Sequence, residues 1–273
     1  MPEPGSVALV TGASSGIGQA AAVALAAAGF QVVGTSRNTS RLGPNDDGVM
    51  FLDLDVTSDA SVTRVAQQVV ERFGRIDVLV NNAGFGAAGA AEESSVAQAQ
   101  RVFDVNVFGL IRMTKAVLPV MRAQGRGRII NISSVMGLVP APYMAIYAAT
   151  KHAIEGYSES VDHEVREHGV RVLLVEPAYT RTAFEANVVQ PDAPLSVYAE
   201  QRQVFDRVTS GPIEGGDDPS IVARSVVAAA TDAKPKLRYA AGPMARRVSA
   251  LRRFVPARAF DRQLRKLNRL PAA

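Results

Sequence analysis

The sequence predicts an α/β protein with a doubly wound parallel sheet, helices on both faces of that sheet, and a small lid on a single main domain. Short apolar segments rich in β-branched residues alternate along the chain with helical segments, as they do in parallel sheets that are buried on both faces. A glycine-rich turn joins the first apolar segment to the first helical one. The chain has 273 residues, 47% of them hydrophobic, which is enough for one large core.

The expected elements follow one another in a regular order that is typical of a Rossmann-type fold. Strands are expected at residues 7–12, 31–36, 49–55, 76–82, 128–133, 171–177 and 236–242. Helices are expected at residues 16–29, 61–73, 97–122, 147–168 and 218–232. Residues 178–216 break the alternation with prolines and scattered apolar residues, so we expect this segment to be irregular. Because it follows a strand, where ligands of such folds bind, we interpret it as the lid.

The composition excludes several kinds of site. There is no cysteine, so disulfides, thiolate metal sites and cysteine nucleophiles are excluded. The three histidines lack the neighbouring carboxylates and nucleophiles of a triad or a metal site, so we expect no metal. The amino-terminal residues lack the basic segment of a secretory signal, and the longest alanine-rich run is too short to cross a bilayer. We therefore expect a cytoplasmic protein.

Positive charge is concentrated near the carboxyl terminus. From Lys234 onward there are 12 Lys or Arg residues and one acidic residue. The preceding chain carries 18 Lys or Arg residues and 25 Asp or Glu residues. We divide the chain into a catalytic domain at residues 1–242 and a basic, partly helical extension at 243–273. Two interpretations of the extension stay open: it packs on the domain or on a second subunit, or it contacts an anionic membrane as a peripheral surface helix. Nucleic acid is not expected, because no aromatic platform or recognised binding motif is present.

The turn TGASSGIG predicts a phosphate site. It places Gly12, Gly16 and Gly18 between the first strand and the first helix. Glycine lets the backbone turn sharply and lets a pyrophosphate approach the amides at the helix N-terminus, where the helix dipole favours anions. The spacing differs from the usual dinucleotide pattern. A purely structural turn, however, does not need three glycines at this junction.

The end of the second strand indicates which dinucleotide binds. An acidic residue there holds the ribose 2′-hydroxyl of NAD, whereas an arginine suits the 2′-phosphate of NADP. The chain offers Ser36, Arg37 and Asn38, so we expect NADP(H) to be preferred over NAD(H). The alternative is that Arg37 is a solvated loop charge.

Tyr147 and Lys151 lie four residues apart in YAATK, so their side chains rise from one face of the expected helix. Such a pair is common on helix surfaces and proves little alone. Carbonyl reduction needs a proton on the substrate oxygen as hydride reaches the carbon, and a phenol can donate it. Free tyrosine has a pKa of about 10, so we expect the neighbouring ammonium to lower the pKa of Tyr147.

Several motifs together resemble the short-chain dehydrogenase/reductase family in its ordinary form. They are TGASSGIG, NNAG at residues 81–84, Asn106 in DVNVFG, Ser134 in NISS, and Tyr147 with Lys151. They occur in the family's order from residue 5 to about residue 182. The resemblance implies an oxidoreductase that interconverts a carbonyl and a secondary alcohol with a nicotinamide cofactor. It also implies a homodimer or homotetramer.

The resemblance assigns a role to each motif residue. Tyr147 is the proton donor or acceptor, and Lys151 tunes it and holds the nicotinamide ribose. Ser134 stabilises the charge on the substrate oxygen, and Asn106 holds a water that relays protons to Lys151. Ala178 stands where the family has glycine. The implied cofactor-binding residues are Gly12, Ser14, Ser15, Gly16, Ile17, Gly18, Arg37, Asp55, Val56, Asn82, Ala83, Gly84, Tyr147, Lys151, Pro177, Thr180 and Thr182.

The substrate and two rival functions stay open. Apolar residues in the lid and in the loop after Ser134 indicate a hydrophobic carbonyl or alcohol. One rival is an NADP(H)-binding sensor or regulator without turnover. The other is an epimerase or dehydratase of the longer relatives, whose glycine spacing fits less well. The paired acids Glu92 and Glu93 have a loop-like context, so we expect them to be solvated.

Overall fold

The computed structural model describes residues 2–42, 47–184 and 187–270. Within them, parallel strands form one sheet in the order β3-β2-β1-β4-β5-β6-β7. The strands are β1 (Val7–Val10), β2 (Gln31–Ser36), β3 (Val49–Asp53), β4 (Val78–Asn81), β5 (Gly127–Ile132), β6 (Val170–Pro177) and β7 (Arg238–Ala241). The strand order reverses direction between β1 and β4. In doubly wound folds a ligand binds at that switch point, beyond the carboxyl ends of the strands.

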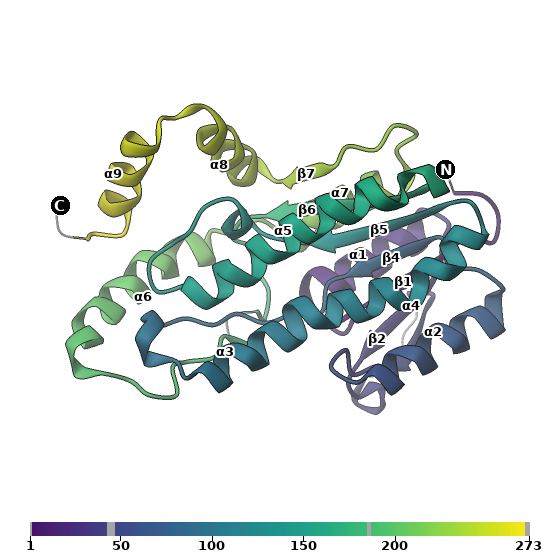
Figure 1. Ribbon diagram of the computed structural model, residues 1–273, viewed down its shortest axis with the longest axis horizontal. Coiled ribbons are helices and arrows are strands. Elements are labelled where there is room, and N and C mark those ends of the chain that lie inside the picture. The colour runs from purple at the N-terminus through teal and green to yellow at the C-terminus, as the bar shows by residue number, and fades with distance from the viewer. Residues whose placement is uncertain (1, 43–46, 185–186, 271–273) are drawn as a thin grey trace.

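Helices cover both faces of the sheet (Figure 1). One face carries α1 (Gly16–Ala27) and α7 (Pro219–Thr231), which pack against each other. The other carries α2 (Asp59–Phe73), α4 (Gly109–Ala123) and α5 (Ala145–Val165). The predicted Rossmann-type α/β fold with a parallel sheet is therefore confirmed.

The central strand β1 is buried on both faces, which explains its unbroken apolar sequence. In β1, Ala8 and Val10 belong to the core beneath α1 and α7, whereas Val7 and Leu9 belong to the core on the other face. This division follows from the two-residue period of a strand, whose successive side chains point to opposite faces. All four side chains are fully buried. An alternating polar pattern would have required one face of the sheet to meet water.

The long helix expected at residues 97–122 is interrupted. The structure has α3 (Val96–Phe103), a π-helical segment (Asp104–Phe108) and then α4. The Gly109 amide donates to the carbonyl oxygen of Asp104, five residues earlier. A π-helical turn inserts one residue into the helical repeat and rotates the following side chains. Hydrophobic periodicity does not reveal such an insertion, because the apolar stripe continues on either side of it.

The expectation that residues 178–216 are irregular is wrong in part. A short 3-10 helix (Ser196–Tyr198) leads into α6 (Ala199–Glu214). Tertiary contacts hold this region: the rings of Tyr198 and Phe205 pack on Tyr143, at centroid distances of 6.5 and 5.8 Å. Contacts between residues so far apart in the sequence leave no local pattern, so the prolines in this segment predicted an irregular structure.

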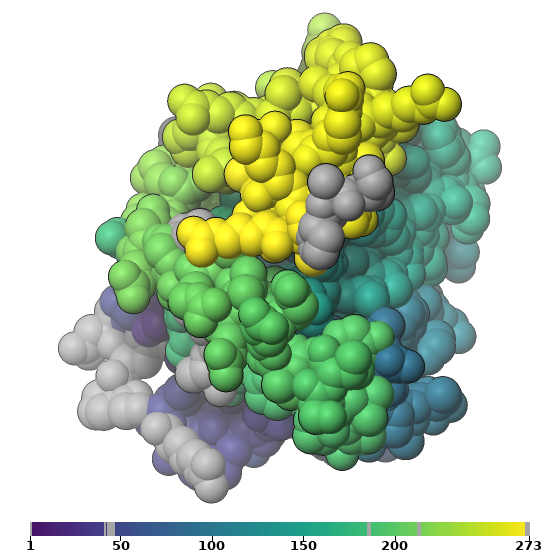
Figure 2. Space-filling model, turned by 90° about the vertical axis from the view of Figure 1, so that its left-hand side faces the viewer, coloured from purple at the N-terminus to yellow at the C-terminus, as the bar shows by residue number. Residues whose placement is uncertain are grey.

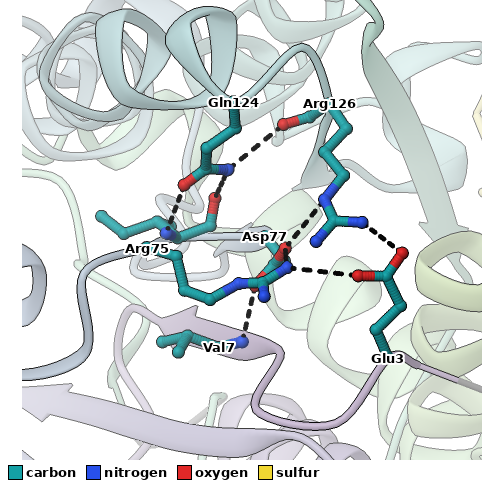
Figure 3. Close-up of polar contacts among 7 residues, drawn as sticks. Glu3, Val7, Arg75, Asp77, Gln124 and Arg126 are labelled. Carbon is teal, nitrogen blue, oxygen red and sulfur yellow. Dashed lines mark hydrogen bonds and ion pairs between the residues drawn. The ribbon is translucent and has the colours of Figure 1, made fainter.

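A polar cluster closes the amino-terminal edge of the sheet (Figure 3). The Asp77 carboxylate accepts hydrogen bonds from the Val7 amide at 2.8 Å and from the Arg75 guanidinium at 2.6 and 2.8 Å. Glu3 forms ion pairs with Arg75 and with Arg126. These contacts join the amino-terminal segment to the connections that precede β4 and β5. They lie at the ends of the strands opposite to the ends where ligands bind.

The carboxyl-terminal segment forms α8 (Pro243–Phe254) and α9 (Ala257–Leu267). Ala245 of α8 is fully buried, and Arg252 donates to the carbonyl oxygen of Leu138 at 3.1 Å. The two helices lie beside α6, at the end of the molecule away from the chain's N-terminus (Figures 1 and 2). Among the described residues, no helix is both long enough and apolar enough to cross a membrane.

Candidate active site

The glycine turn forms a cradle that fits a phosphate group. Gly12 and Gly16 have φ angles of 65° and 57°, which favour glycine. A Cβ atom on Gly18 would collide with the carbonyl oxygen of Gly12, so the strand and the helix approach closely here. The hydroxyl of Ser15, the N-cap of α1, makes no capping hydrogen bond, and the first turn of α1 has no acidic residue. The helix N-terminus therefore presents free amides and a positive dipole end.

The segment after β4 holds this turn in place. The hydroxyl oxygen of Thr11 accepts hydrogen bonds from the amides of Asn82 and Ala83, both at 3.0 Å. The Asn82 side chain donates to the carbonyl oxygens of Thr11 and Gly12, also at 3.0 Å. Sequence reasoning missed Thr11, although its position directly before the first glycine is a usable signal.

A buried polar network connects the sheet to α5. Asn81 donates to the side-chain oxygen of Asn131 at 2.9 Å, and Asn131 donates to the Ser158 hydroxyl at 2.8 Å. Ser158 in turn donates to the carbonyl oxygen of Ile154 at 2.6 Å. The network spans β4, β5 and α5. It fixes the height of α5 against the strand ends, and α5 carries both Tyr147 and Lys151. Asn131 and Ser158 are further residues that sequence reasoning did not single out.

Tyr147, Ser134 and Lys151 come together in a buried cluster. Each is only 8% exposed. The phenol of Tyr147 hydrogen bonds with the Ser134 hydroxyl. The Lys151 nitrogen lies 5.5 Å from the centroid of the Tyr147 ring and donates to the carbonyl oxygen of Ile132 at 2.9 Å. The sequence spacing had placed these side chains on one helix face, and in the structure that face is turned toward the end of β5.

Asn106 lies in the π-helical segment and contacts the same cluster indirectly. Its side-chain oxygen accepts from the Phe85 amide at 3.0 Å, and its side-chain nitrogen donates to the Phe85 carbonyl oxygen at 2.9 Å. The same nitrogen lies 3.4 Å from the Thr150 hydroxyl, which donates to the carbonyl oxygen of Tyr147 at 2.7 Å. The Asn106 side chain is thus engaged by protein groups, and no direct contact with Lys151 occurs.

The pKa of Tyr147 differs from the expected direction. Burial raises it, because a phenolate loses its solvation, and the hydrogen bond with Ser134 only partly opposes the rise. Burial also lowers the pKa of Lys151 to about 8, with the charge of Glu155 opposing the change. The expected lowering of the Tyr147 pKa is therefore wrong for the chain alone. The ammonium bonds to a backbone carbonyl instead of the phenol oxygen, and desolvation exceeds its attraction for the phenolate.

The residues predicted for the adenosine end lie apart from this cluster. Arg37 is exposed at the end of β2 and forms no ion pair with any described residue. The Asp55 carboxylate accepts from the amide and the hydroxyl of Thr57, which lower its pKa, and Arg37 adds to that lowering. Val56 is buried, and a Cβ atom on Gly109 would lie 2.8 Å from it. Arg37 and Asp55 are therefore close enough to interact electrostatically.

The start of the predicted lid lies over the site. Thr182 packs against Gly16, because a Cβ atom there would lie 3.2 Å from the Thr182 side chain. The Phe184 ring packs on the Tyr147 ring with their centroids 5.6 Å apart. Pro177 is buried at the end of β6, and the Thr180 hydroxyl donates to the carbonyl oxygen of Ala178 at 3.2 Å. The start of this segment thus covers both the glycine cradle and the phenol.

Glu93 anchors the lid, and the expectation that it is solvated is wrong. Its side chain is fully buried and accepts from the amides of Ala90 at 3.0 Å and Leu195 at 2.7 Å. It also forms an ion pair with Arg202 of α6. Burial acts to raise the pKa of Glu93, but these donors hold it below its usual value. A loop-like context in sequence therefore concealed a buried carboxylate whose partners lie in the lid.

The fold and the site define a dinucleotide-binding oxidoreductase, and comparisons with known proteins agree. A family model described as short chain dehydrogenase matches residues 6–193. The 3-ketodihydrosphingosine reductase of Bacteroides thetaiotaomicron is 44% identical over 179 residues, which are 66% of this chain and 65% of that protein. This chain thus aligns with slightly less than two thirds of that relative.

Two solved structures extend the similarity to nearly the whole chain. A short-chain dehydrogenase from Streptomyces avermitilis has a TM-score of 0.80 and 36% identity, covering 98% of both chains. A short chain dehydrogenase/reductase from Burkholderia phymatum in complex with NAD also has a TM-score of 0.80, at 30% identity and 97% coverage of both chains. The chain belongs to the short-chain dehydrogenase/reductase family. Its fold binds a nicotinamide cofactor, and the protein is an oxidoreductase.

Proposed function

We propose that the protein is an NADP(H)-dependent oxidoreductase that interconverts a hydrophobic carbonyl and its secondary alcohol. The single observation that carries the proposal is the buried cluster of Tyr147, Ser134 and Lys151, in which the Lys151 ammonium lies 5.5 Å from the centroid of the Tyr147 ring. The glycine cradle has no side chains at Gly12, Gly16 and Gly18, so the pyrophosphate fits there. Family membership supports the reaction class, and the residue roles are our assignment.

In the proposed reduction, a bound nicotinamide would supply hydride to the carbonyl carbon. Tyr147 gives its phenolic proton to the substrate oxygen, and Ser134 donates a hydrogen bond to that oxygen as its charge develops. Lys151 lies close enough to stabilise the phenolate that Tyr147 becomes. Burial strengthens both interactions, because charges act at longer range where water is excluded. Asn106 positions this machinery through Thr150 and, by our proposal, holds the proton-relaying water.

The lid and the loop after Ser134 support an apolar substrate. Tyr143, Tyr198 and Phe205 form one aromatic cluster, and Phe184 covers the Tyr147 ring. Tyr143 has a φ angle of 61°, an unusual conformation for a bulky residue that the surrounding contacts must hold. The Bacteroides relative is named a 3-ketodihydrosphingosine reductase, which is a reductase of a ketone. We propose that the substrate's apolar part takes the place of Phe184 against the Tyr147 ring.

The proposed function is tested by NADPH oxidation across matched apolar and polar ketones, with NADH alongside. We expect the apolar long-chain and ring ketones to react with the higher kcat/KM. Reduction of small polar sugars far faster than every apolar ketone would disprove the substrate assignment. NADPH binding without turnover of any carbonyl would favour the rival function, a dinucleotide-binding sensor.

The preference for NADP(H) is proposed on Arg37. This exposed guanidinium at the end of β2 has no ion-pair partner among the described residues and can donate hydrogen bonds to a 2′-phosphate. We expect Arg37→Ala to raise the KM for NADPH by roughly 10- to 100-fold, the usual range for losing a charged hydrogen bond. The KM for NADH should stay nearly constant, since NAD lacks the phosphate.

Arg224→Ala is the matched control for Arg37→Ala. It removes another exposed arginine, on α7, that is not among the proposed cofactor residues. Steady-state kinetics with both cofactors measure the two variants. Equal changes with NADPH and NADH in Arg37→Ala would show that Arg37 acts without reading the phosphate, as the solvated-charge alternative holds.

We further propose that the extension, residues 243–273, docks the enzyme on an anionic lipid surface. Met244, Arg247, Leu251 and Phe254 share one outward face of α8 by their helical spacing. The three apolar members are 48%, 52% and 77% exposed. Arg247 and Arg253 form no ion pair with any described residue. Exposed apolar groups flanked by unpaired cations are the composition that binds such surfaces.

The position of α8 relates this face to the active site. Figure 2 shows α8 and α9, in yellow, above the green lid helix α6 at one end of the molecule. Leu195 and Val197, just before α6, are also exposed apolar residues of the lid. Lipid contact at this end would therefore bring the lid close to an apolar substrate dissolved in the membrane.

Replacing both Leu251 and Phe254 with glutamate tests the lipid contact. We expect cosedimentation with phosphatidylserine-containing vesicles to fall roughly tenfold, because apolar area is lost and negative charge is added. Val96→Glu, which changes an equally exposed apolar residue outside the extension, should bind as the wild type does. Equal binding to pure phosphatidylcholine vesicles would contradict the role of charge. An unchanged pellet in the double variant would disprove docking through α8.

By the same family resemblance we propose a homodimer or homotetramer in the cytoplasm, with residues 1–242 as the catalytic domain. Light scattering on the full chain and on the chain ending at residue 242 tests whether the extension packs on a second subunit. If the shorter chain keeps its subunit number, the extension does not hold the oligomer together.

A further inference from the structure

A cluster of acidic side chains around one arginine lies one turn of α5 beyond Lys151. Glu155 follows Lys151 by one turn of α5 and is 5% exposed. The guanidinium of Arg238, on β7, forms ion pairs with Glu155 and Glu176 and, at 2.7 Å, with Glu159. Glu176, at the end of β6, is also buried. The cluster thus joins α5 to Glu176 near the carboxyl end of β6 and to Arg238, the first residue of β7.

The charges in this cluster do not balance. Arg238 is the only cation in contact with three carboxylates, Glu155, Glu159 and Glu176, among the described residues. Lys151 is the nearest further cation on α5, and its ammonium interacts electrostatically with Glu155. Glu159 is half exposed, whereas Glu155 and Glu176 are both buried and share the one guanidinium of Arg238. A buried carboxylate close to another carboxylate keeps its proton to a higher pH.

Glu155 is the member that carries the unmet interaction. Its Oε1 atom is buried without a hydrogen-bond partner, as is the hydroxyl of Ser133 beside it. The two atoms lie near each other without full hydrogen-bond geometry, although Ser133 still acts to lower the pKa of Glu155. A Cβ atom on Gly137 would lie 2.8 Å from the Ser133 hydroxyl and 2.9 Å from Glu155 Oε1, so no larger residue fits beside them. Burial raises the pKa of Glu155 to about 7, and the charge of Glu176 adds to the rise.

We propose that Glu155 is a positioning residue for Lys151: its buried carboxylate, one turn of α5 away and held by Arg238, stabilises the ammonium of Lys151 against loss of its proton. The groups that face Glu155 are Lys151 and Glu159 on α5, Glu176 on β6 and Arg238 on β7, while the loop at Gly137 brings no charge. Below neutral pH, Lys151 stays protonated without help. Above neutral pH, Glu155 supplies the negative charge that offsets desolvation of the ammonium.

This proposal rests on the proposed function, because it concerns the lysine that supports Tyr147. It gives Glu155 no contact with substrate or cofactor. It predicts an effect on the pH dependence of the reaction, whereas a purely structural glutamate would change activity equally at every pH. Glu159 provides a matched control, because it lies on the same helix as Glu155 and binds the same guanidinium but is half exposed.

The test compares Glu155→Gln with Glu159→Gln across the pH range of carbonyl reduction. In Glu155→Gln we expect the alkaline fall of kcat/KM to begin roughly one pH unit earlier, since an opposing charge beside Lys151 is lost. Glu159→Gln should keep the wild-type profile. Glu155→Asp, which restores the charge, should move the profile back toward that of the wild type. An unshifted profile in Glu155→Gln would overturn the proposal.

A second measurement needs no turnover, so it stays informative if the proposed function fails. The raised pKa of Glu155 favours the folded state below about pH 4.5, and this contribution is lost as pH rises through about 7. The Tm of Glu155→Gln should therefore gain on that of the wild type between about pH 5 and about pH 8. Glu159→Gln should show no such gain. A constant Tm difference for Glu155→Gln would show that Glu155 does not hold the proton.

Discussion

Replacing Tyr147 with phenylalanine is expected to lower kcat for carbonyl reduction by roughly 10²- to 10⁴-fold, the usual contribution of a positioned proton donor. The variant loses only the hydroxyl that hydrogen bonds with Ser134. The ring keeps its packing against Phe184, and Ser134 keeps its contact with the Met136 amide at 3.1 Å. Affinity for NADPH, measured by fluorescence titration, should therefore change little. Stopped-flow and steady-state assays measure the loss of turnover.

Tyr157→Phe is the matched control, because it removes the same hydroxyl from the same helix at a half-buried position. It should keep wild-type kcat. If Tyr147→Phe and Tyr157→Phe reduced carbonyls equally well, another group would have to donate the proton. If the wild type bound NADPH but reduced no carbonyl, a dinucleotide-binding sensor would be the better description of the protein.

The sheet was predictable because its signal is local. The strand β1 is apolar throughout, and the glycine turn and α1 follow it directly. The ends of elements were less predictable: the third strand ends at Asp53 instead of residue 55, and the expected helix at 147–168 ends at Val165 before a short 3-10 turn. These ends depend on hydrogen bonds to other segments.

The site residues could be named from sequence, but their electrostatics could not. The spacing of Tyr147 and Lys151 predicted a shared helix face, and the structure places both beside Ser134. It did not predict that burial raises the pKa of Tyr147, because that burial depends on Phe184, which lies far along the chain. Glu93 was mistaken for a solvated acid for the same reason: its partners lie about one hundred residues further along the chain.

Substituting alanine for Gly18 is expected to have the other large effect, on cofactor binding and on stability. The added Cβ atom would collide with the Gly12 carbonyl oxygen and the Asn82 side chain, and would lie 2.9 Å from the Gly12 carbonyl carbon. The obstacle is backbone, together with the asparagine that anchors the turn at 3.0 Å. The turn must open, so the amides of α1 no longer converge on a phosphate. We expect NADPH affinity to fall at least tenfold and the free energy of unfolding to drop by about 1–3 kcal/mol.

Gly156→Ala separates this steric effect from the general effect of alanine in a helix. Gly156 also lies inside an α-helix, but its Cβ position meets no atom within 4 Å. There alanine should stabilise the protein by about 0.5–1 kcal/mol, because the unfolded chain loses freedom. Calorimetry should therefore show changes in stability of opposite sign for the same substitution at the two positions. NADPH titration should show weaker binding for Gly18→Ala. If Gly18→Ala bound NADPH like the wild type, the close approach at the turn would not be needed for the cradle, and the phosphate would have to be held by side chains such as Ser15 instead of by the α1 amides.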